Sequence, residues 1–258
     1  MTLYNHISDT MFIETNSALS VDCIVFGFDG KMLKVLLIKR KYPENSAQAN
    51  DLKLPGAMIL ENETIGDAAS RVLKESTGLD NIFLKQTSIF SSPKRVSEKE
   101  LEWICDYHKI KTHRVVTVGY YAMVNLTEGI VNYTLRCGAV WRPVDEIHHL
   151  IMDHMEILSD ALNILQREMM YSTIAFEFLP KRFTIRQLQN LFTAVYGVEI
   201  DSRNFRKKLF STKLLKETNE VEKNVAHKPA KYYEFNRAVF KKAVNQKFKL
   251  SFLSHLIY

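Results

Sequence analysis

Residues 54–79 read LPGAMILENETIGDAASRVLKESTGL and contain the most informative pattern in the chain. The stretch opens with a Pro-Gly pair at the end of a strand, carries glutamates in a loop, and becomes amphipathic over 65–76. Gly78 follows, where glycine tolerates the left-handed conformation that closes a helix. The pattern predicts a strand end, a loop and a helix that stops at Gly78.

The spacing in this stretch resembles the Nudix box of the Nudix hydrolase superfamily. The matching positions are Glu63, Arg71, Leu73, Glu75, Gly78 and Leu79. Three positions depart from the box, because Ala57 replaces a glycine and Val72 and Ser76 replace two glutamates. The resemblance implies a Nudix α/β/α sandwich with a ligand cleft beside the box helix.

In the family, the two missing glutamates and the one kept as Glu75 hold divalent metal ions that activate water against a diphosphate. Magnesium needs several oxygen ligands, and positions 72, 75 and 76 share one helix face, which here carries a single carboxylate. We therefore expect no metal, no cofactor and no catalytic residue. The alternatives are an active hydrolase of ADP-ribose or a sugar nucleotide, in which Glu61 and Glu63 join Glu75 around a metal, and an unrelated amphipathic helix.

The composition indicates a globular chain with room for two domains. Of its 258 residues, 46% are hydrophobic and 25% are charged, and no apolar run approaches the roughly twenty residues of a membrane span. The first residues do not resemble a signal peptide, and the three cysteines lack zinc-site spacing. We expect a cytoplasmic protein with no membrane partner.

The charge is divided unevenly along the chain. Residues 181–258 contain 17 Lys+Arg against 6 Asp+Glu, a net charge of +11, whereas the preceding residues contain 18 against 23, a net of −5. Such polarity favours a polyanionic partner for the C-terminal third only. We divide the chain into a Nudix-like domain over 1–150, a connecting helix and hinge over 151–180, and a basic domain over 181–258.

Hydrophobic periodicity predicts the elements around the box. Helices are expected at 97–107, as an insertion, and at 152–170 with Asp153 as N-cap. Strands are expected at 20–28, 34–38, 82–90, 114–126 and 133–141.

The basic third has the order of a winged helix. Thr184 and Gln187 form a capping box that opens one helix, and a second helix begins near Asp201 with Phe205, Leu209 and Phe210 facing inward. A hairpin over 214–218 and 231–235 would form the wing. The predicted DNA-binding residues are Thr184, Arg203, Asn204, Arg206, Lys207, Lys208, Lys228 and Lys231.

A degenerate Nudix box before a basic winged helix resembles the Nudix-related transcriptional regulators. That resemblance implies a homodimer that binds a double-stranded DNA operator, as a repressor, and a small effector in the Nudix cleft. Family branches sense ADP-ribose or sugars such as arabinose, and a pentose is favoured here because a site without metal ligands binds a diphosphate less well. The residues assigned to the effector are Arg40, Lys53, Glu63, Glu75 and Arg114. A protein-interaction adaptor is a further alternative.

Overall fold

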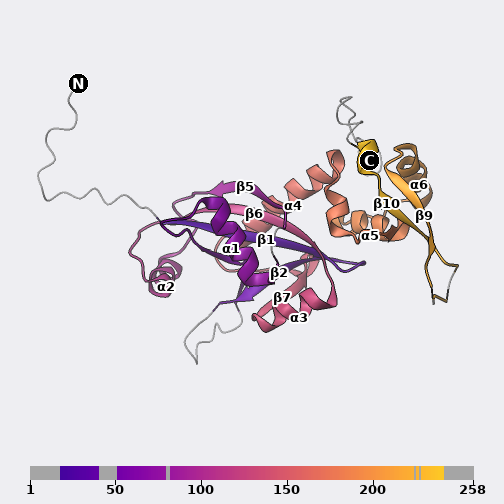
Figure 1. The fold of residues 1–258 in the computed structure, drawn as a ribbon. Coiled ribbons are helices and arrows are strands. Elements are labelled where there is room, and N and C mark those ends of the chain that lie inside the picture. The colour runs from indigo at the N-terminus through magenta and orange to yellow at the C-terminus, as the bar shows by residue number, and fades with distance from the viewer. Residues whose placement is uncertain (1–17, 41–50, 80–81, 224, 227, 241–258) are drawn as a thin grey trace, which may run out of the picture.

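The computed structural model describes residues 18–40, 51–79, 82–223, 225–226 and 228–240. It has a layered N-terminal part and a smaller C-terminal part joined by one long helix (Figure 1). The N-terminal sheet runs in the order β3-β2-β1-β6-β5, with β4 paired to β1 and β7 to β2. Its strands are β1 (Leu19–Phe28), β2 (Leu33–Lys39), β3 (Leu52–Lys53), β4 (Gly56–Met58), β5 (Leu84–Phe90), β6 (Val116–Asn125) and β7 (Ala139–Pro143).

The central strand β1 supplies apolar side chains to both faces of this sheet. Val21, Cys23 and Val25 pack on one face with the apolar side of helix α1 (Ile65–Thr77). Ile24 and Phe26 point to the opposite face and pack with helix α4 (His154–Tyr171). This alternation follows from the two-residue period of a strand and explains why almost every residue of β1 is buried. The expected α/β/α sandwich is confirmed.

The box helix α1 begins and ends as its sequence predicts. Thr64 caps its first turn, with the side chain of Asp67 bonded back to the Thr64 amide. Gly78 closes it at φ 70°, and a Cβ there would lie 2.5 Å from the ring of Tyr133. Glycine is therefore required at this position by both the backbone conformation and the packing.

Two predictions along the N-terminal part need correction. Residues 133–136 belong to helix α3 (Glu128–Arg136) instead of a strand, because Thr127 caps a helix that runs through them, and the strand itself is β7. The Asp153 carboxylate precedes α4 but makes no capping bond, since it is paired with Arg95. The predicted insertion helix is confirmed as α2 (Glu98–His108).

The C-terminal part is a winged helix. Helices α5 (Ile185–Tyr196) and α6 (Ser202–Ser211) are followed by a sheet in the order β8-β10-β9. The strands are β8 (Phe183–Thr184), β9 (Leu215–Val221) and β10 (Lys231–Phe235). Phe205 and Leu209 are buried as predicted, but Phe210 is 41% exposed, with its ring tilted by 59° against that of Tyr233 and the ring centres 5.6 Å apart.

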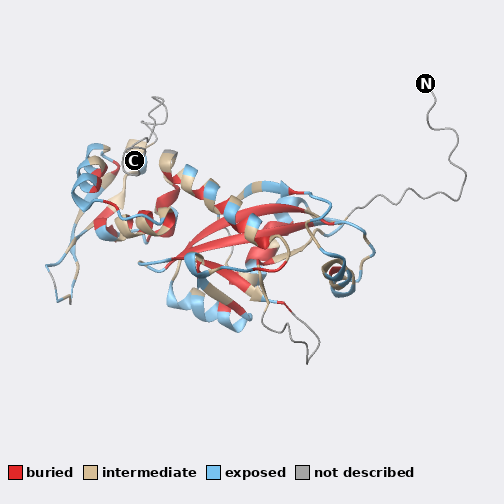
Figure 2. Cartoon of the chain, turned by 180° about the vertical axis from the view of Figure 1, so that it is seen from behind, coloured by how far each residue is buried: buried red, intermediate tan, exposed pale blue. Residues whose placement is uncertain are grey.

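Helix α4 and the short 3-10 helix η2 (Ile174–Phe178) join the two parts through one continuous apolar core. Figure 2 shows buried residues in both parts of the chain. Gln166 of α4 donates to the Val195 carbonyl at 2.8 Å and its own carbonyl accepts from the Tyr196 hydroxyl at 2.6 Å. The Asn190 amide reaches the carbonyl of Gly30 in the β1–β2 turn at 3.0 Å. The proposed domain boundaries near 150 and 180 stay a prediction.

Within the described ranges, none of the helices has the length and apolar character needed to cross a membrane.

Replacement of Leu165 by alanine tests the shared core. Leu165 is fully buried on α4, so we expect the variant to lose about 2–5 kcal/mol of unfolding free energy. Leu135→Ala is the matched control, because Leu135 is 62% exposed, and its effect should stay below about 0.5 kcal/mol. Urea denaturation measures both, and equal losses would contradict the assignment of Leu165 to the core.

Candidate effector cleft and DNA-binding surface

A cleft of about 570 Å³ lies beside the box helix. One wall is the face of α1 that carries Val72, Glu75 and Ser76, and the opposite wall comes from α2. The end of β2 and the floor around Gly56 complete it. The sequence prediction of a cleft next to the box is consistent with this arrangement.

At the floor of the cleft, Gly56 packs directly against the backbone and side chains of β1. A Cβ on Gly56 would lie 1.9 Å from the Oδ1 atom of Asp22 and 2.7 Å from the carbonyl of Val21. No other residue type fits there without movement of the backbone. The chain therefore requires a glycine at position 56. This is one residue before Ala57, which stands where the box has its glycine.

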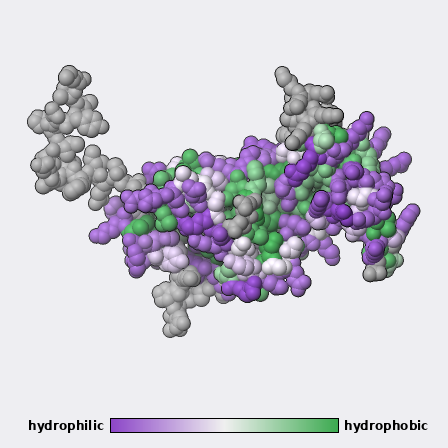
Figure 3. All heavy atoms as spheres, in the orientation of Figure 1, coloured by the Kyte–Doolittle hydropathy of each residue, from purple (hydrophilic) through white to green (hydrophobic). Residues whose placement is uncertain are grey.

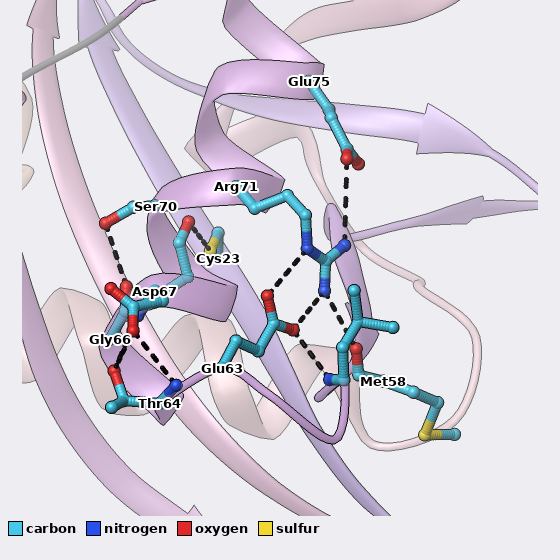
Figure 4. A network of polar contacts seen from close by, with 11 residues as sticks. Cys23, Met58, Glu63, Thr64, Gly66, Asp67, Ser70, Arg71 and Glu75 are labelled. Atoms are coloured by element: carbon cyan, nitrogen blue, oxygen red, sulfur yellow. Dashed lines mark hydrogen bonds and ion pairs between the residues drawn. The ribbon is translucent and has the colours of Figure 1, made fainter.

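The box arginine organises the loop in front of α1 (Figure 4). Arg71 donates from Nη2 and Nε to the Glu63 carboxylate at 2.6 and 3.0 Å, and from Nη2 to the Met58 carbonyl at 3.0 Å. Glu63 also accepts the Leu60 amide at 2.8 Å. The bonds from Arg71 hold the pKa of Glu63 below its usual range. Glu63 does not line the cleft, and its contacts shape this loop; its predicted contact with the effector stays a prediction.

The metal-binding face of the box does not fit a magnesium pair. Val72 is 3% exposed and packs into the core, and the hydroxyl of Ser76 is bonded to the Val72 carbonyl. Glu75 supplies the only carboxylate among these three residues, and it lies 3.8 Å from the guanidinium of Arg71. No cluster of three or more potential ligands occurs in the described part of the chain.

Cationic side chains line the other side of the cleft. Lys39, Arg40 and Lys53 all border it, which agrees with the placement predicted for Arg40 and Lys53. The Arg40 guanidinium lies 4.2 Å from the centre of the Trp103 ring on α2, a cation–π contact. Arg114 lies elsewhere: it is exposed, bonds the Ser91 carbonyl and is absent from the lining of the cleft.

A buried polar cluster lies beneath the floor, and sequence reasoning missed most of it. It contains Asp22, Lys53, Arg95 and His154, which surround a small cavity of about 50 Å³. The available signal was an aspartate inside the apolar run of β1, because a buried carboxylate needs partners. The partners come from distant segments, and their spacing in the sequence gave no indication of them.

His154 links this cluster to the strand end before the box. Its Nδ1 accepts the Leu54 amide at 2.9 Å, and its Nε2 lies 3.7 Å from Asp22. Since Nδ1 is an acceptor, the proton of the neutral ring is on Nε2 and faces the carboxylate. Burial lowers the pKa of His154 to about 3, and burial raises the pKa of Asp22. The ring is therefore neutral near physiological pH.

The outward side of α6 is the candidate DNA-binding surface. Arg203, Asn204, Arg206 and Lys207 are exposed on it, and Lys208 is half-buried. The side of the molecule in Figure 3 that carries α6 and the wing is largely hydrophilic. Asp201 caps α6 by accepting the Asn204 amide at 2.8 Å. This geometry suits a helix whose first turns enter a DNA groove.

Two predicted DNA contacts lie in different surroundings. Thr184 is 2% exposed and its hydroxyl accepts the Gln187 amide at 3.2 Å, so this residue caps α5 and is removed from the DNA-binding set. Lys231 is exposed on β10 but ion-paired with Glu217 across the wing. Lys228, also exposed, lies closer to the wing tip.

Comparison with known families identifies both parts. The NUDIX domain matches residues 16–159, which is more than half of the chain. The chain belongs to the Nudix family. Its C-terminal part matches the NrtR DNA-binding winged helix domain over residues 175–235. The predicted combination of a Nudix domain and a winged helix is confirmed.

Relatives of this Nudix protein are similar over most of their length. The ADPR responsive transcriptional repressor NtrR of Acinetobacter baylyi is 26% identical over 222 residues, covering 84% of this chain and 81% of that protein. Shewanella oneidensis NrtR, in its crystal structure complexed with a 27mer DNA, gives a TM-score of 0.68 at 23% identity, covering 86% of this chain and 95% of that chain. The crystal structure of a MutT/nudix family protein from Enterococcus faecalis gives a TM-score of 0.61 at 25% identity, covering 86% of this chain and 89% of that chain.

The lowered pKa of His154 predicts a loss of stability in acid. The ordinary pKa of a histidine is about 6.5, so between about pH 6.5 and pH 3 the His154 side chain binds a proton in the unfolded chain but not in the folded chain. The contribution of neutral His154 to the free energy of unfolding is complete above pH 6.5 and falls by at most about 1.4 kcal/mol per pH unit below it. His154→Asn keeps an acceptor for the Leu54 amide and removes this titration. The difference in unfolding free energy between the wild type and this variant should therefore decrease by about 1 kcal/mol per pH unit as the pH falls from 6 to 4.

Urea denaturation across this pH range measures the difference. The raised pKa of Asp22 acts in the opposite direction, favouring the folded state at low pH, but it is present in both proteins and cancels in the comparison. Parallel stability profiles for wild type and variant would contradict a buried neutral His154.

Proposed function

We propose that this protein is a cytoplasmic transcriptional repressor that binds operator DNA through its winged helix and releases it when ADP-ribose occupies the Nudix cleft. The observation that carries the proposal is the union, in one chain, of a Nudix cleft without a fitting metal site and an NrtR-type DNA-binding domain with an exposed basic helix. The relative from Acinetobacter baylyi is named for a response to ADPR and for transcriptional repression.

ADP-ribose replaces a pentose as the favoured effector. The sequence alone favours a sugar, because a diphosphate needs its charge neutralised and the metal ligands are missing. The cleft supplies other charges for that purpose, since Lys39 and Arg40 border it together with Lys53, whose pKa is lowered by burial. Arginine and lysine hold phosphate groups without a metal. The comparisons give no support to a sugar.

The same cleft supports binding without hydrolysis. Two-metal phosphoryl chemistry needs several converging carboxylates, and the box face offers Glu75 with Val72 and Ser76 beside it. We therefore assign the protein as a regulator and not as an enzyme. The competing hydrolase function would be favoured by magnesium-dependent release of AMP from ADP-ribose that Glu75→Gln abolishes.

On the DNA side, α6 is proposed as the recognition helix. A homodimer would hold two copies of α6 about 34 Å apart, which is one turn of DNA, and would match a palindromic operator. Arg203, Asn204 and Arg206 are proposed to contact bases or nearby phosphates, with Lys207 and Lys208 on the backbone and Lys228 and Lys231 at the wing.

Arg203→Ala and Arg206→Ala test the recognition helix. Each change should weaken operator binding by about 1–3 kcal/mol if the side chain contacts a base, because an unpaired base edge is left behind. Fluorescence anisotropy with a duplex from the region upstream of the gene measures the affinity at several salt concentrations. Lys111→Ala, an exposed lysine before β6, is the control and should leave the affinity unchanged. A binding constant independent of salt would contradict the DNA assignment.

Titration of the protein–DNA complex with ADP-ribose tests the effector and its binding mode. We expect release of DNA, with the same midpoint in EDTA and in magnesium, because the cations of the cleft take the place of metal ions. Arg40→Gln should raise the midpoint at least about tenfold, since a buried charge–phosphate contact is worth about 1.5–3 kcal/mol.

Parallel titrations with arabinose and xylose complete this experiment. Release by a sugar and not by ADP-ribose would overturn the effector assignment. Release only in the presence of magnesium would overturn the metal-free binding mode.

A further inference from the structure

The segment that leads into α2 is tied to the start of α4 by a buried ion pair. Arg95 donates from Nε and Nη2 to the two carboxylate oxygens of Asp153, each at 2.7 Å. Both side chains are less than a tenth exposed. Nη1 of Arg95 reaches the Thr117 hydroxyl at 2.7 Å, and that hydroxyl is in turn bonded to Ser20. The bidentate contact ties the start of α4 to the segment before α2, and the bond to Thr117 ties both to the sheet.

A second contact joins the same two elements. The Oε2 atom of Glu100 accepts the amide and hydroxyl of Ser97 and so caps α2, while its Oε1 accepts the Met152 amide at 3.0 Å. Met152 has φ 54°, a left-handed conformation that is uncommon for a residue with a side chain. The unusual backbone just before α4 is thus held by a carboxylate from α2.

Helix α2 also forms one wall of the effector cleft. Trp103, Tyr107 and His108 line it, and Trp103 and Tyr107 stack with ring centres 5.0 Å apart. A ligand in the cleft therefore contacts the element that carries Glu100. The other end of α4 contacts the winged helix through Gln166, which bonds Val195 and Tyr196.

We propose that Arg95 and Glu100 form a latch, defined by their contacts with Asp153 and Met152, that transmits occupancy of the cleft from α2 to α4. The inference rests on the proposed function and specifies its regulation. A displacement of α2 by ligand must carry the start of α4 with it as long as both contacts hold. The two residues are positioning residues, because neither is assigned a contact with the effector or with DNA.

The measured quantity is the coupling factor, which is the dissociation constant for DNA at saturating ADP-ribose divided by that without it. For the wild type we expect a factor within about 5–150. We expect Arg95→Lys and Glu100→Gln each to lower the coupling factor at least about threefold. Arg95→Lys keeps the charge but loses the bidentate geometry. Glu100→Gln cannot accept hydrogen bonds from both Ser97 and Met152.

Calorimetric binding of ADP-ribose to each free variant and anisotropy of DNA without effector complete the experiment. Both affinities should stay within about threefold of the wild type while the coupling factor falls. The factor is a ratio of two constants measured on the same folded molecules, so a merely structural defect does not change it. Glu98→Gln is the control, because Glu98 is exposed in the same first turn of α2 and makes the same change of charge.

A full coupling factor in Arg95→Lys and Glu100→Gln would overturn the latch, as would an equal fall in Glu98→Gln. If ADP-ribose fails to release DNA from the wild type, the proposed function itself is wrong. The wild-type titration thus separates the two failures.

Discussion

Helix α4 has to bury apolar side chains against two different folded units, and this constraint organises the molecule. It covers the face of the sheet formed by Ile24 and Phe26, and near its end Glu168 still accepts a hydrogen bond from the Tyr121 hydroxyl of β6 at 2.8 Å. Together with η2 it also continues into the core of the winged helix, where Phe178 is fully buried. The register of α4 is therefore set from both sides at once. A shift at its beginning, where His154 contacts the Leu54 amide, cannot be absorbed without a response at its end.

The parts of the fold that depend on local sequence could be predicted. Three such features follow from periodicity or from the chemistry of a few neighbouring residues. They are the helix end at Gly78, the capping box of Thr184 and Gln187, and the burial of Phe205 on α6. The strand expected at 133–141 begins only at Ala139, because the β-favouring side chains of residues 133–136 lie in helix α3. There the cap at Thr127 and packing against α1 outweigh intrinsic propensity.

The candidate site could be predicted only in part, for a physical reason. Box residues lie within one segment, so their shared face follows from helix geometry. The cluster of Asp22, Arg95 and His154 is assembled from three segments, and its members are brought together by burial instead of spacing. The preference for a neutral ligand has the same limit, since it considers the box alone, whereas Arg40 and Lys53, which border the cleft, come from segments outside the box helix.

The continuous core has a consequence for how such a protein can change over evolution. One cluster of buried side chains contains Phe26 of the sheet, Leu165 of α4 and Phe192 of α5, so the apolar seam between the two parts belongs to neither of them alone. Recombination that joined this winged helix to a different sensor would expose that seam unless the new partner supplied a matching helix. The exchangeable module is thus the sensor–helix–wing unit as a whole, and new ligand specificities are reached more readily by substitutions inside the cleft than by swapping domains.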